Sequence, residues 1–266
     1  MNLTRVYAIF LRQMYLLRDN PTRLFQLFVW VVVDLIIWGF ITKYLLSFVP
    51  PTFGVITFFL GAVILWGFLL RVMQGMTTPF LEDVWSKNFL NIFGSPLTIS
   101  EYITGLVLTS ICTSVMVLVG VLLIATLVFG FSLFVLGMQL IPFLLILFLF
   151  GIALGIFGVA IVLRIGPSAE WLVWPIPALL NPFVGVFYPP TILPEWMQFV
   201  SKALPPSYVF EGMRNAVLSG GFSWAALIWG IALAIFYIVL SYAFFDHTYR
   251  IVVRDGLIAR FEAEGP

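Results

Sequence analysis

Few residues in this chain are suited to catalysis by a nucleophile with a base, or by a bound metal ion. The chain has one histidine, His247, and one cysteine, Cys112, and the only carboxylate close to His247 in the sequence is its neighbour Asp246. Metal sites and covalent mechanisms both need several such groups together. We therefore expect no metal site, no catalytic residue and, with a single cysteine, no disulfide within the chain.

Asp34 is the one acidic residue near the middle of a long apolar stretch. A charged side chain there costs about 2.5 to 3.5 kcal/mol on insertion scales, so another group should compensate it. Lys43 is a poor partner, because nine residues at about 100° each place it on the opposite face of a helix. We expect Asp34 to face a polar group of another span or of a second copy of the chain. Its role is then in a conduit or a dimer seam, or else in a structural hydrogen bond.

The elements that position these residues must be helices in a membrane. Hydrophobic residues make up 62% of the chain and charged ones 9%, with a mean hydropathy of +1.11, which excludes an ordinary soluble domain. In lipid every backbone amide needs an internal partner, and the apolar runs are continuous rather than alternating, so an all-α fold is predicted. Residues 1–266 should form a single transmembrane domain. Windows of about 20 residues predict six spans, at 24–45, 53–72, 102–129, 133–163, 171–188 and 223–245.

Basic residues gather on one side of these predicted spans. By the positive-inside rule that side is cytoplasmic, so we expect a multi-pass protein of the cell (inner or plasma) membrane with both termini in the cytoplasm. Dispersed charges and a net charge of +1 give no reason to expect nucleic acid. The first 23 residues lack the short apolar core of a cleaved signal peptide. The richer side has Arg5, Arg12, Arg18, Arg23, Arg71, Lys87, Arg164, Arg250, Arg254 and Arg260, against Lys43, Lys202 and Arg214 on the other.

The N-terminal segment is predicted to be an interfacial helix on the inner leaflet, ended by Asn20-Pro21. It is either a plain anchor or a functional linker. Arg5 and Arg12 share the face opposite to its apolar residues, which recur at helical spacing and are Leu3, Val6, Tyr7, Phe10, Met14 and Leu17.

The long connection from Arg71 to Glu101 is predicted to contain a short amphipathic helix on the cytoplasmic side. Thr78-Pro79 would start this helix, because proline is tolerated at the first helical position. The acidic pair Glu82 and Asp83 would then occupy the first turns, where the helix dipole favours negative charge. The helix either packs on headgroups or transmits a push from a soluble partner. Its apolar face would be Leu81, Trp85, Phe89, Ile92 and Phe93.

The second long connection, Tyr188 to Phe222, is expected at the outer leaflet and reads as two amphipathic helices broken at Leu204-Pro205-Pro206. Glu211 and Arg214 stand three residues apart and could pair, which would let the second helix dip below the headgroups as a re-entrant element. A surface cap without a transport role is the alternative. The apolar residues of the two helices are Trp196, Phe199, Val200 and Ala203, then Phe210, Met213 and Val217.

Prolines crowd the fifth predicted span, and Pro175, Pro177 and Pro182 should kink or break its helix. Broken membrane helices often line cavities or hinges, although Trp and Tyr at both ends of a span also fit an interfacial belt. The aromatic residues that would then face a passage, together with Asp34, are Trp171, Trp174, Phe183, Phe187 and Tyr188. Gly151 and Gly155 in the fourth span make a Gly-x-x-x-Gly face for close helix packing.

Two motifs resemble those of the permease subunits of ABC type-2 exporters, and the resemblance covers nearly the whole chain. One is Tyr188-Pro-Pro-Thr-Ile-Leu-Pro-Glu-Trp196 with Leu204-Pro-Pro-Ser-Tyr-Val-Phe-Glu-Gly-Met-Arg214, similar to the family's outer proline-rich segment and terminal Glu-x-x-Arg helix. The other is Leu81-Glu-Asp-Val-Trp-Ser-Lys-Asn-Phe-Leu90 leading to Ser95-Pro-Leu-Thr98, similar to the family's coupling element.

The resemblance implies a permease that dimerises, with each copy binding one cytosolic ATPase that holds ATP and magnesium. It implies outward export of a hydrophobic, lipid-linked or polysaccharide-type substrate, with membrane lipid as a further partner. The implied ATPase contacts are Leu81, Glu82, Asp83, Trp85, Phe89 and Phe93. None of Lys43, Lys87 and Lys202 lies in a phosphate-binding Gly-x-x-x-x-Gly-Lys loop, so the energy must come from another polypeptide.

Two other classes stay open. A secondary carrier or channel with inverted three-span repeats fits the long connection after the second span of each half, although one Asp34 is few ionisable groups for a carrier. A membrane-embedded transferase or protease would need a catalytic grouping that the chain lacks.

Overall fold

The computed structural model describes residues 1–48, 53–88, 91–92, 94–131, 137–218 and 223–255. Every regular element in these ranges is a helix. The long helices are α1 (Leu3–Asp19), α2 (Pro21–Leu46), α3 (Phe53–Trp85), α5 (Ile99–Phe129), α6 (Leu140–Ile165) and α11 (Trp224–Arg254). The short ones are η2 (Pro167–Ala169), α7 (Glu170–Val173), α8 (Pro175–Val184), η3 (Pro190–Ile192), α9 (Glu195–Ala203) and α10 (Pro205–Leu218).

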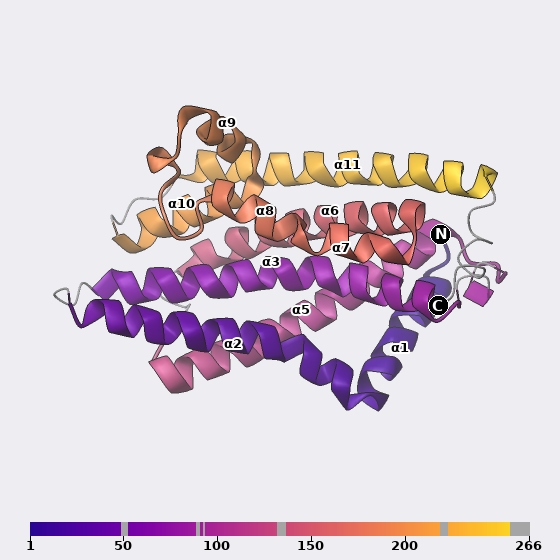
Figure 1. The fold of residues 1–266 in the computed structure, drawn as a ribbon, viewed down its shortest axis with the longest axis horizontal. Helices are drawn as coiled ribbons and strands as arrows, with labels where there is room; N and C mark the ends of the chain where they lie inside the picture. Colours follow the sequence, from indigo (N-terminus) through magenta and orange to yellow (C-terminus); the bar gives the residue numbers. More distant parts are fainter. Residues whose placement is uncertain (49–52, 89–90, 93, 132–136, 219–222, 256–266) are drawn as a thin grey trace.

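Five of the described helices are long and apolar enough to cross a membrane: Pro21–Tyr44, Thr57–Trp85, Ile99–Phe129, Gly137–Ile165 and Trp224–Arg254. They run along the long axis of the molecule (Figure 1), and together they make the chain a multi-pass membrane protein. The most apolar windows of α3 and α6 are 72% buried, whereas those of α2, α5 and α11 are 17%, 28% and 22% buried. The bundle is therefore built around α3 and α6, with the other three helices outside.

Close backbone approach holds the two central helices together. A Cβ atom on Gly151 would stand 2.8 Å from Cβ of Val72, and one on Gly155 would stand 2.9 Å from the sulfur of Met76. Small residues allow this approach between membrane helices. The close packing predicted from the Gly-x-x-x-Gly spacing is confirmed, and its partner is α3.

The fifth predicted span is broken, in agreement with its proline content. The segment forms η2, α7 and α8, each too short to cross a membrane by itself. Ala169 and Trp174, at the two ends of α7, keep right-handed helical dihedrals, so the chain does not turn there. The helix is interrupted because prolines such as Pro175 have no N–H group to donate. Its first part, η2 and α7, lies alongside α6 (Figure 1). The described structure thus supports five spans and a broken helical segment in place of a sixth.

The second span was predicted to end at residue 72, which is too early, and the helix start predicted at Thr78-Pro79 is wrong. α3 continues to Trp85, with Pro79 inside it. Tight packing explains this, because a Cβ on Gly75 would stand 2.8 Å from the Ser110 backbone on α5, and Phe80 and Val84 are buried. Neighbouring helices make an interior proline tolerable in a membrane helix.

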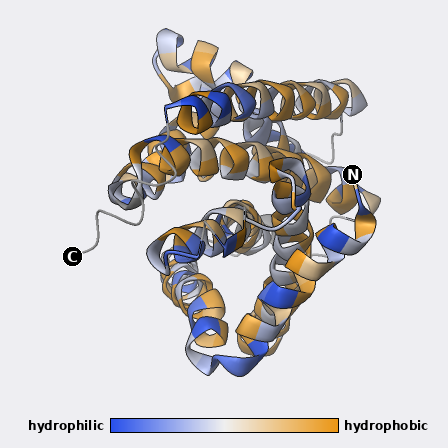
Figure 2. Cartoon of the chain, turned by 90° about the vertical axis from the view of Figure 1, so that its right-hand side faces the viewer, coloured by the Kyte–Doolittle hydropathy of each residue, from blue (hydrophilic) through white to orange (hydrophobic). Residues whose placement is uncertain are grey.

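α1 is a helix as predicted, but it packs on α5 through a different face. Val6, Ile9 and Gln13 are buried, while Leu3 and Tyr7 of the predicted apolar face are exposed. Figure 2 views the bundle from the end that carries α1, called here the α1 end, and shows hydrophilic residues gathering where α1 meets α2. α9 lies at the opposite end (Figure 1).

Candidate functional site

A buried ion pair joins α1 to α3 at the α1 end. Nη1 of Arg12 donates a hydrogen bond of 2.8 Å to Oδ2 of Asp83, and Nη2 donates to Oδ1. The hydroxyl of Tyr102, on α5, donates to the same carboxylate at 2.7 Å. Asp83 is 2% exposed and Tyr102 is fully buried. The hydrogen bond to Asp83 raises the pKa of Arg12 above its ordinary value, as expected for a bidentate charge-assisted contact.

A second ion pair lies beside the first. Arg23, in the first turns of α2, is 3.0 Å from Glu82 in the last turn of α3. Glu82 and Asp83 were predicted to sit at a helix N-terminus, where the dipole favours carboxylates. They sit instead at a C-terminus, where it opposes them. Arg12 and Arg23 supply the compensation, and this accounts for two arginines facing the last turn of one helix.

The start of α5 is tied to the start of α1. Thr98 and Glu101 form a capping box at the N-terminus of α5. Glu101 also accepts a 2.6 Å hydrogen bond from the Asn2 backbone and is 3.6 Å from Arg5, which itself donates to the Pro96 carbonyl. These groups constitute the α1 clamp: Arg5, Arg12, Arg23, Glu82, Asp83, Glu101 and Tyr102.

The structure separates the residues expected to couple to an ATPase. Leu81 and Asp83 are 1% and 2% exposed and face the protein interior, so they offer no contact surface. Glu82 is occupied by Arg23. Trp85 is 47% exposed at the end of α3, which makes it the described member of the set that is open to a partner. Phe89 and Phe93 lie outside the described residues.

Asp34 lines a cleft among α2, α3 and the segment from α8 to Phe187. Asn181 of α8 lines the same cleft, as do Trp38 and Trp66. The ion pairs and hydrogen bonds of the described residues include none for Asp34. A polar neighbour from another element was predicted, and Asn181 is one, although no hydrogen bond joins the two side chains.

The aromatic residues predicted to share a passage with Asp34 lie in different places. Phe187 lines the Asp34 cleft and stacks on Trp38, with ring centroids 4.3 Å apart. Trp171 is 83% exposed, and Trp174 lines a separate cavity at the α1 end. The ring centroid of Phe183 lies 6.1 Å from that of Trp196 on α9. Only Phe187 of these aromatics is therefore grouped with the carboxylate.

The two helices predicted near Trp196 and Phe210 are present as α9 and α10. Trp196 and Phe199 are exposed on α9, whereas Phe210 of α10 is fully buried, 6.2 Å from the ring of Trp66. The two amphipathic helices are thus unequal: α9 leaves its apolar face uncovered, and α10 packs into the bundle.

The predicted pairing of Glu211 with Arg214 is wrong, because no ion pair within 4.0 Å joins them. Arg214 donates a 2.9 Å hydrogen bond to the carbonyl of Gly185, just past the C-terminus of α8, where a cation is favoured. Its guanidinium carbon also lies 4.9 Å from the ring centroid of Phe58. Burial lowers the pKa of Arg214 below its ordinary value. The residue fastens α10 to the broken segment.

Comparison with known protein families agrees with this architecture. The model of the ABC-2 type transporters matches residues 4–218, from α1 through α10. The chain belongs to the ABC-2 type transporter family. It is a transport permease, and its family works with an ABC ATPase subunit. No curated protein matches the chain.

Several clamp residues of this ABC-2 type transporter were missed in our sequence analysis. Thr98-x-x-Glu101 before an apolar run is a capping-box signature, so Glu101 could have been found. Arg12 was placed on a solvent face, and nothing in its spacing points to Asp83, which lies 71 residues away. Asn181 stands in a proline-rich stretch without a polar pattern, so its place near Asp34 depends on how that stretch packs.

Proposed function

We propose that this chain is the membrane subunit of an ATP-driven exporter. It moves a hydrophobic, lipid-linked or polysaccharide-type substrate outward, with energy from a separate cytosolic ABC ATPase that binds ATP and magnesium. Two copies form a homodimer, and the α1 end with both termini faces the cytoplasm. The arginines of the clamp support this orientation, because basic residues are retained on the cytoplasmic side.

The α1 clamp is the observation that carries the proposal. The connection between α3 and α5 runs from Ser86 to Thr98, and clamp residues hold the helix on each side of it. Glu82 and Asp83 hold the end of α3, and Glu101 holds the start of α5. A displacement of this connection is therefore passed to α1, α2 and α5 together rather than lost in a loose loop.

α3 then carries the displacement through the membrane. It is a continuous helix of 33 residues, about 50 Å long at 1.5 Å per residue, and it forms the centre of the bundle with α6. Its middle lines the Asp34 cleft through Val63 and Trp66. A movement imposed at Trp85 thus reaches the residues that we assign to the conduit.

A secondary carrier with inverted repeats finds no support in the described structure. The second helix of the first half, α3, is continuous, while its counterpart in the second half is broken into η2, α7 and α8. The connection after α3 also contains no counterpart of α9 and α10 in its described residues.

The test is co-purification and transport with the ABC ATPase that partners this permease. Trp85→Ala should reduce the ATPase retained by the tagged permease at least fivefold, because the ring is the exposed apolar group at the end of α3. Trp196→Ala is the matched control, since that exposed indole lies at the opposite end. Purified permease alone in vesicles should move no substrate, and uphill transport without the ATPase would overturn the proposal.

A further inference from the structure

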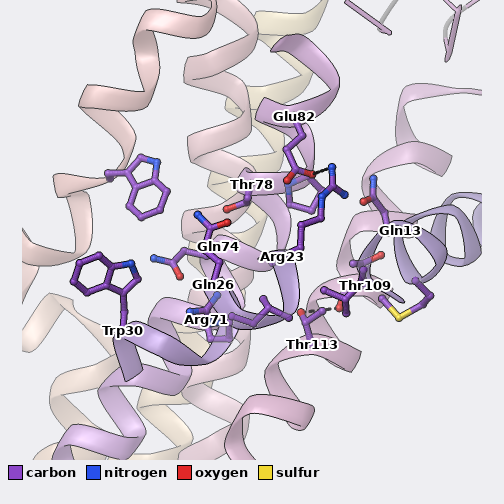
Figure 3. A pocket seen from close by; sticks show the side chains of 16 residues that line it. Gln13, Arg23, Gln26, Trp30, Arg71, Gln74, Thr78, Glu82, Thr109 and Thr113 are labelled. Carbon is purple, nitrogen blue, oxygen red and sulfur yellow. Dashed lines mark hydrogen bonds and ion pairs between the residues drawn. The ribbon is translucent and has the colours of Figure 1, made fainter. Parts of the chain in front are cut away.

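A cavity that is partly open to the surroundings lies at the α1 end between α1, α2, α3, α5 and Trp174. Figure 3 shows Arg71, Gln74, Gln26 and Trp30 along one side and Gln13 on the other. The cavity is distinct from the cleft of Asp34, since the two share no lining residue.

Arg71 is buried in this cavity without a partner. The residue is 6% exposed, and its Nε has no hydrogen bond. None of the ion pairs among the described residues includes it. Sequence analysis had placed Arg71 in a cytoplasmic loop, but the extension of α3 to Trp85 carries it into the protein. An unpaired charge in a membrane protein is costly and is by default a sign of a binding function.

Three glutamines supply further unoccupied polar groups. Gln13 is 4% exposed, and it lines the cavity with Gln26 and Gln74. No hydrogen bond of the described residues involves the side chain of any of these three. Gln74 is half-buried and Gln26 is exposed, and each amide NH₂ group can donate two hydrogen bonds. The cavity therefore presents several free donors around one cation.

The charge balance of the lining selects an anion. Glu82 is the one carboxylate among the lining residues, and it is neutralised by Arg23 at 3.0 Å. Arg71 is then left as an excess positive charge. An arginine fork with neighbouring donors matches the geometry of a phosphate group.

The walls of the cavity fit an amphiphile rather than a fully polar anion. Leu17, Leu27 and Trp30 line it beside the glutamines, and Trp30 is 63% exposed. The cavity lies next to the corner where α1 meets α2, the region that the orientation above places at the inner leaflet surface. Basic pockets between membrane helices on that side bind anionic lipid headgroups.

We propose that the cavity between α1, α2, α3 and α5 binds a phosphate-bearing anion, with Arg71 on the phosphate and the glutamine amides on its oxygens, and that the bound group is the headgroup of an inner-leaflet amphiphile. The binding step is a property of the permease alone. Its failure would therefore leave the ATP-driven export proposal standing, and the loss of that proposal would leave this binding step standing.

Native mass spectrometry of the purified full-length chain tests the proposal with three probes: phosphatidylglycerol, phosphatidylcholine and inorganic phosphate. We expect one tight phosphatidylglycerol per chain and weaker retention of phosphatidylcholine, whose headgroup has no net charge. Arg71→Gln should weaken phosphatidylglycerol binding roughly tenfold, the usual scale for losing a charge-assisted hydrogen bond. Arg18→Gln is the matched control, since Arg18 is exposed at the same end and does not line the cavity.

The outcomes separate the sources of the anion. Displacement of phosphatidylglycerol by inorganic phosphate at equal concentration would assign the site to a soluble phosphate, with the same recognition by Arg71. Equal binding by wild type, Arg71→Gln and Arg18→Gln would overturn the site. If Arg71→Gln is not recovered from membranes, Gln13→Leu and Gln74→Leu take its place. Each should weaken binding about threefold, and unchanged affinity in both would also overturn the site.

Discussion

The α1 clamp and the Asp34 cleft treat charge in opposite ways. In the clamp, Asp83 is almost completely buried and is met by Arg12 and the Tyr102 hydroxyl. In the cleft, Asp34 has no charged partner among the described residues and only an amide, Asn181, nearby. The first arrangement joins helices, and the second leaves an exposed carboxylate without a partner at the edge of a cleft.

This contrast separates charged groups that stabilise the fold from charged groups that we assign to function. A paired carboxylate has used its capacity for hydrogen bonds, so its removal should be felt in the stability of the protein. An unpaired carboxylate in a membrane helix weakens the fold, so we propose that Asp34 makes its functional contact at another stage of transport. Arg71 at the α1 end belongs with Asp34 in this respect, although it lies a few turns from the clamp.

Asp83→Ala should give the largest effect on stability. It leaves Arg12 and the Tyr102 hydroxyl without their partner, and breaking a buried pair typically costs about 3 to 5 kcal/mol. The free energy of unfolding in mixed detergent–SDS micelles measures it. Asp246→Ala is the matched control, because its pair with Arg250 is exposed, with side chains 44% and 77% accessible. Asp246→Ala should lower the free energy of unfolding by less than about 1 kcal/mol. Equal losses in both variants would contradict a stabilising role for the α1 clamp.

Asp34→Asn should act in the opposite direction. Removal of the unpaired charge should raise the stability of the permease by about 2 kcal/mol, given the insertion cost of a carboxylate. Export by the complex should fall at least tenfold if the carboxylate serves the conduit. Glu211→Gln, an exposed carboxylate on α10, is the control for charge loss alone. Normal export by Asp34→Asn would show that its charge is dispensable, and reduced stability would reveal a partner, such as one from a second copy.

Sequence patterns were sufficient for features set by composition and local spacing. Continuous apolar runs predicted the membrane helices. Gly151 and Gly155 predicted close packing, and Pro175 and Pro177 predicted a broken segment. Each of these depends on residues within a few turns of one another, so a single stretch of sequence contains the information.

Features that depend on distant residues were not predictable in this way. Thr78-Pro79 satisfies the local rule for a helix start, but the packing of Gly75 on Ser110 keeps α3 continuous. That extension converts Glu82 and Asp83 from the start of a helix to its end, and it moves Arg71 from a loop into the interior. Glu211 and Arg214 have favourable helical spacing, yet the carbonyl of Gly185 competes for the arginine. Local spacing indicates which residues could interact, and tertiary packing determines which of these contacts form.

Arg23→Gln should give the smallest change in the free energy of unfolding. It tests whether the contribution of each ion pair in the clamp increases with its burial. The Arg23–Glu82 side chains are 27% and 23% exposed, against 31% and 3% for Arg12–Asp83. Glu82 is more exposed than Asp83, so solvent screens the Arg23–Glu82 pair more strongly. We therefore expect Arg23→Gln to lower the free energy of unfolding by about 1 kcal/mol. Raising the salt from 0.05 M to 0.5 M should remove most of the difference between Arg23→Gln and wild type. It should leave the cost of Asp83→Ala nearly unchanged. A salt-insensitive loss at Arg23 as large as that at Asp83 would mean that both pairs act as one buried network.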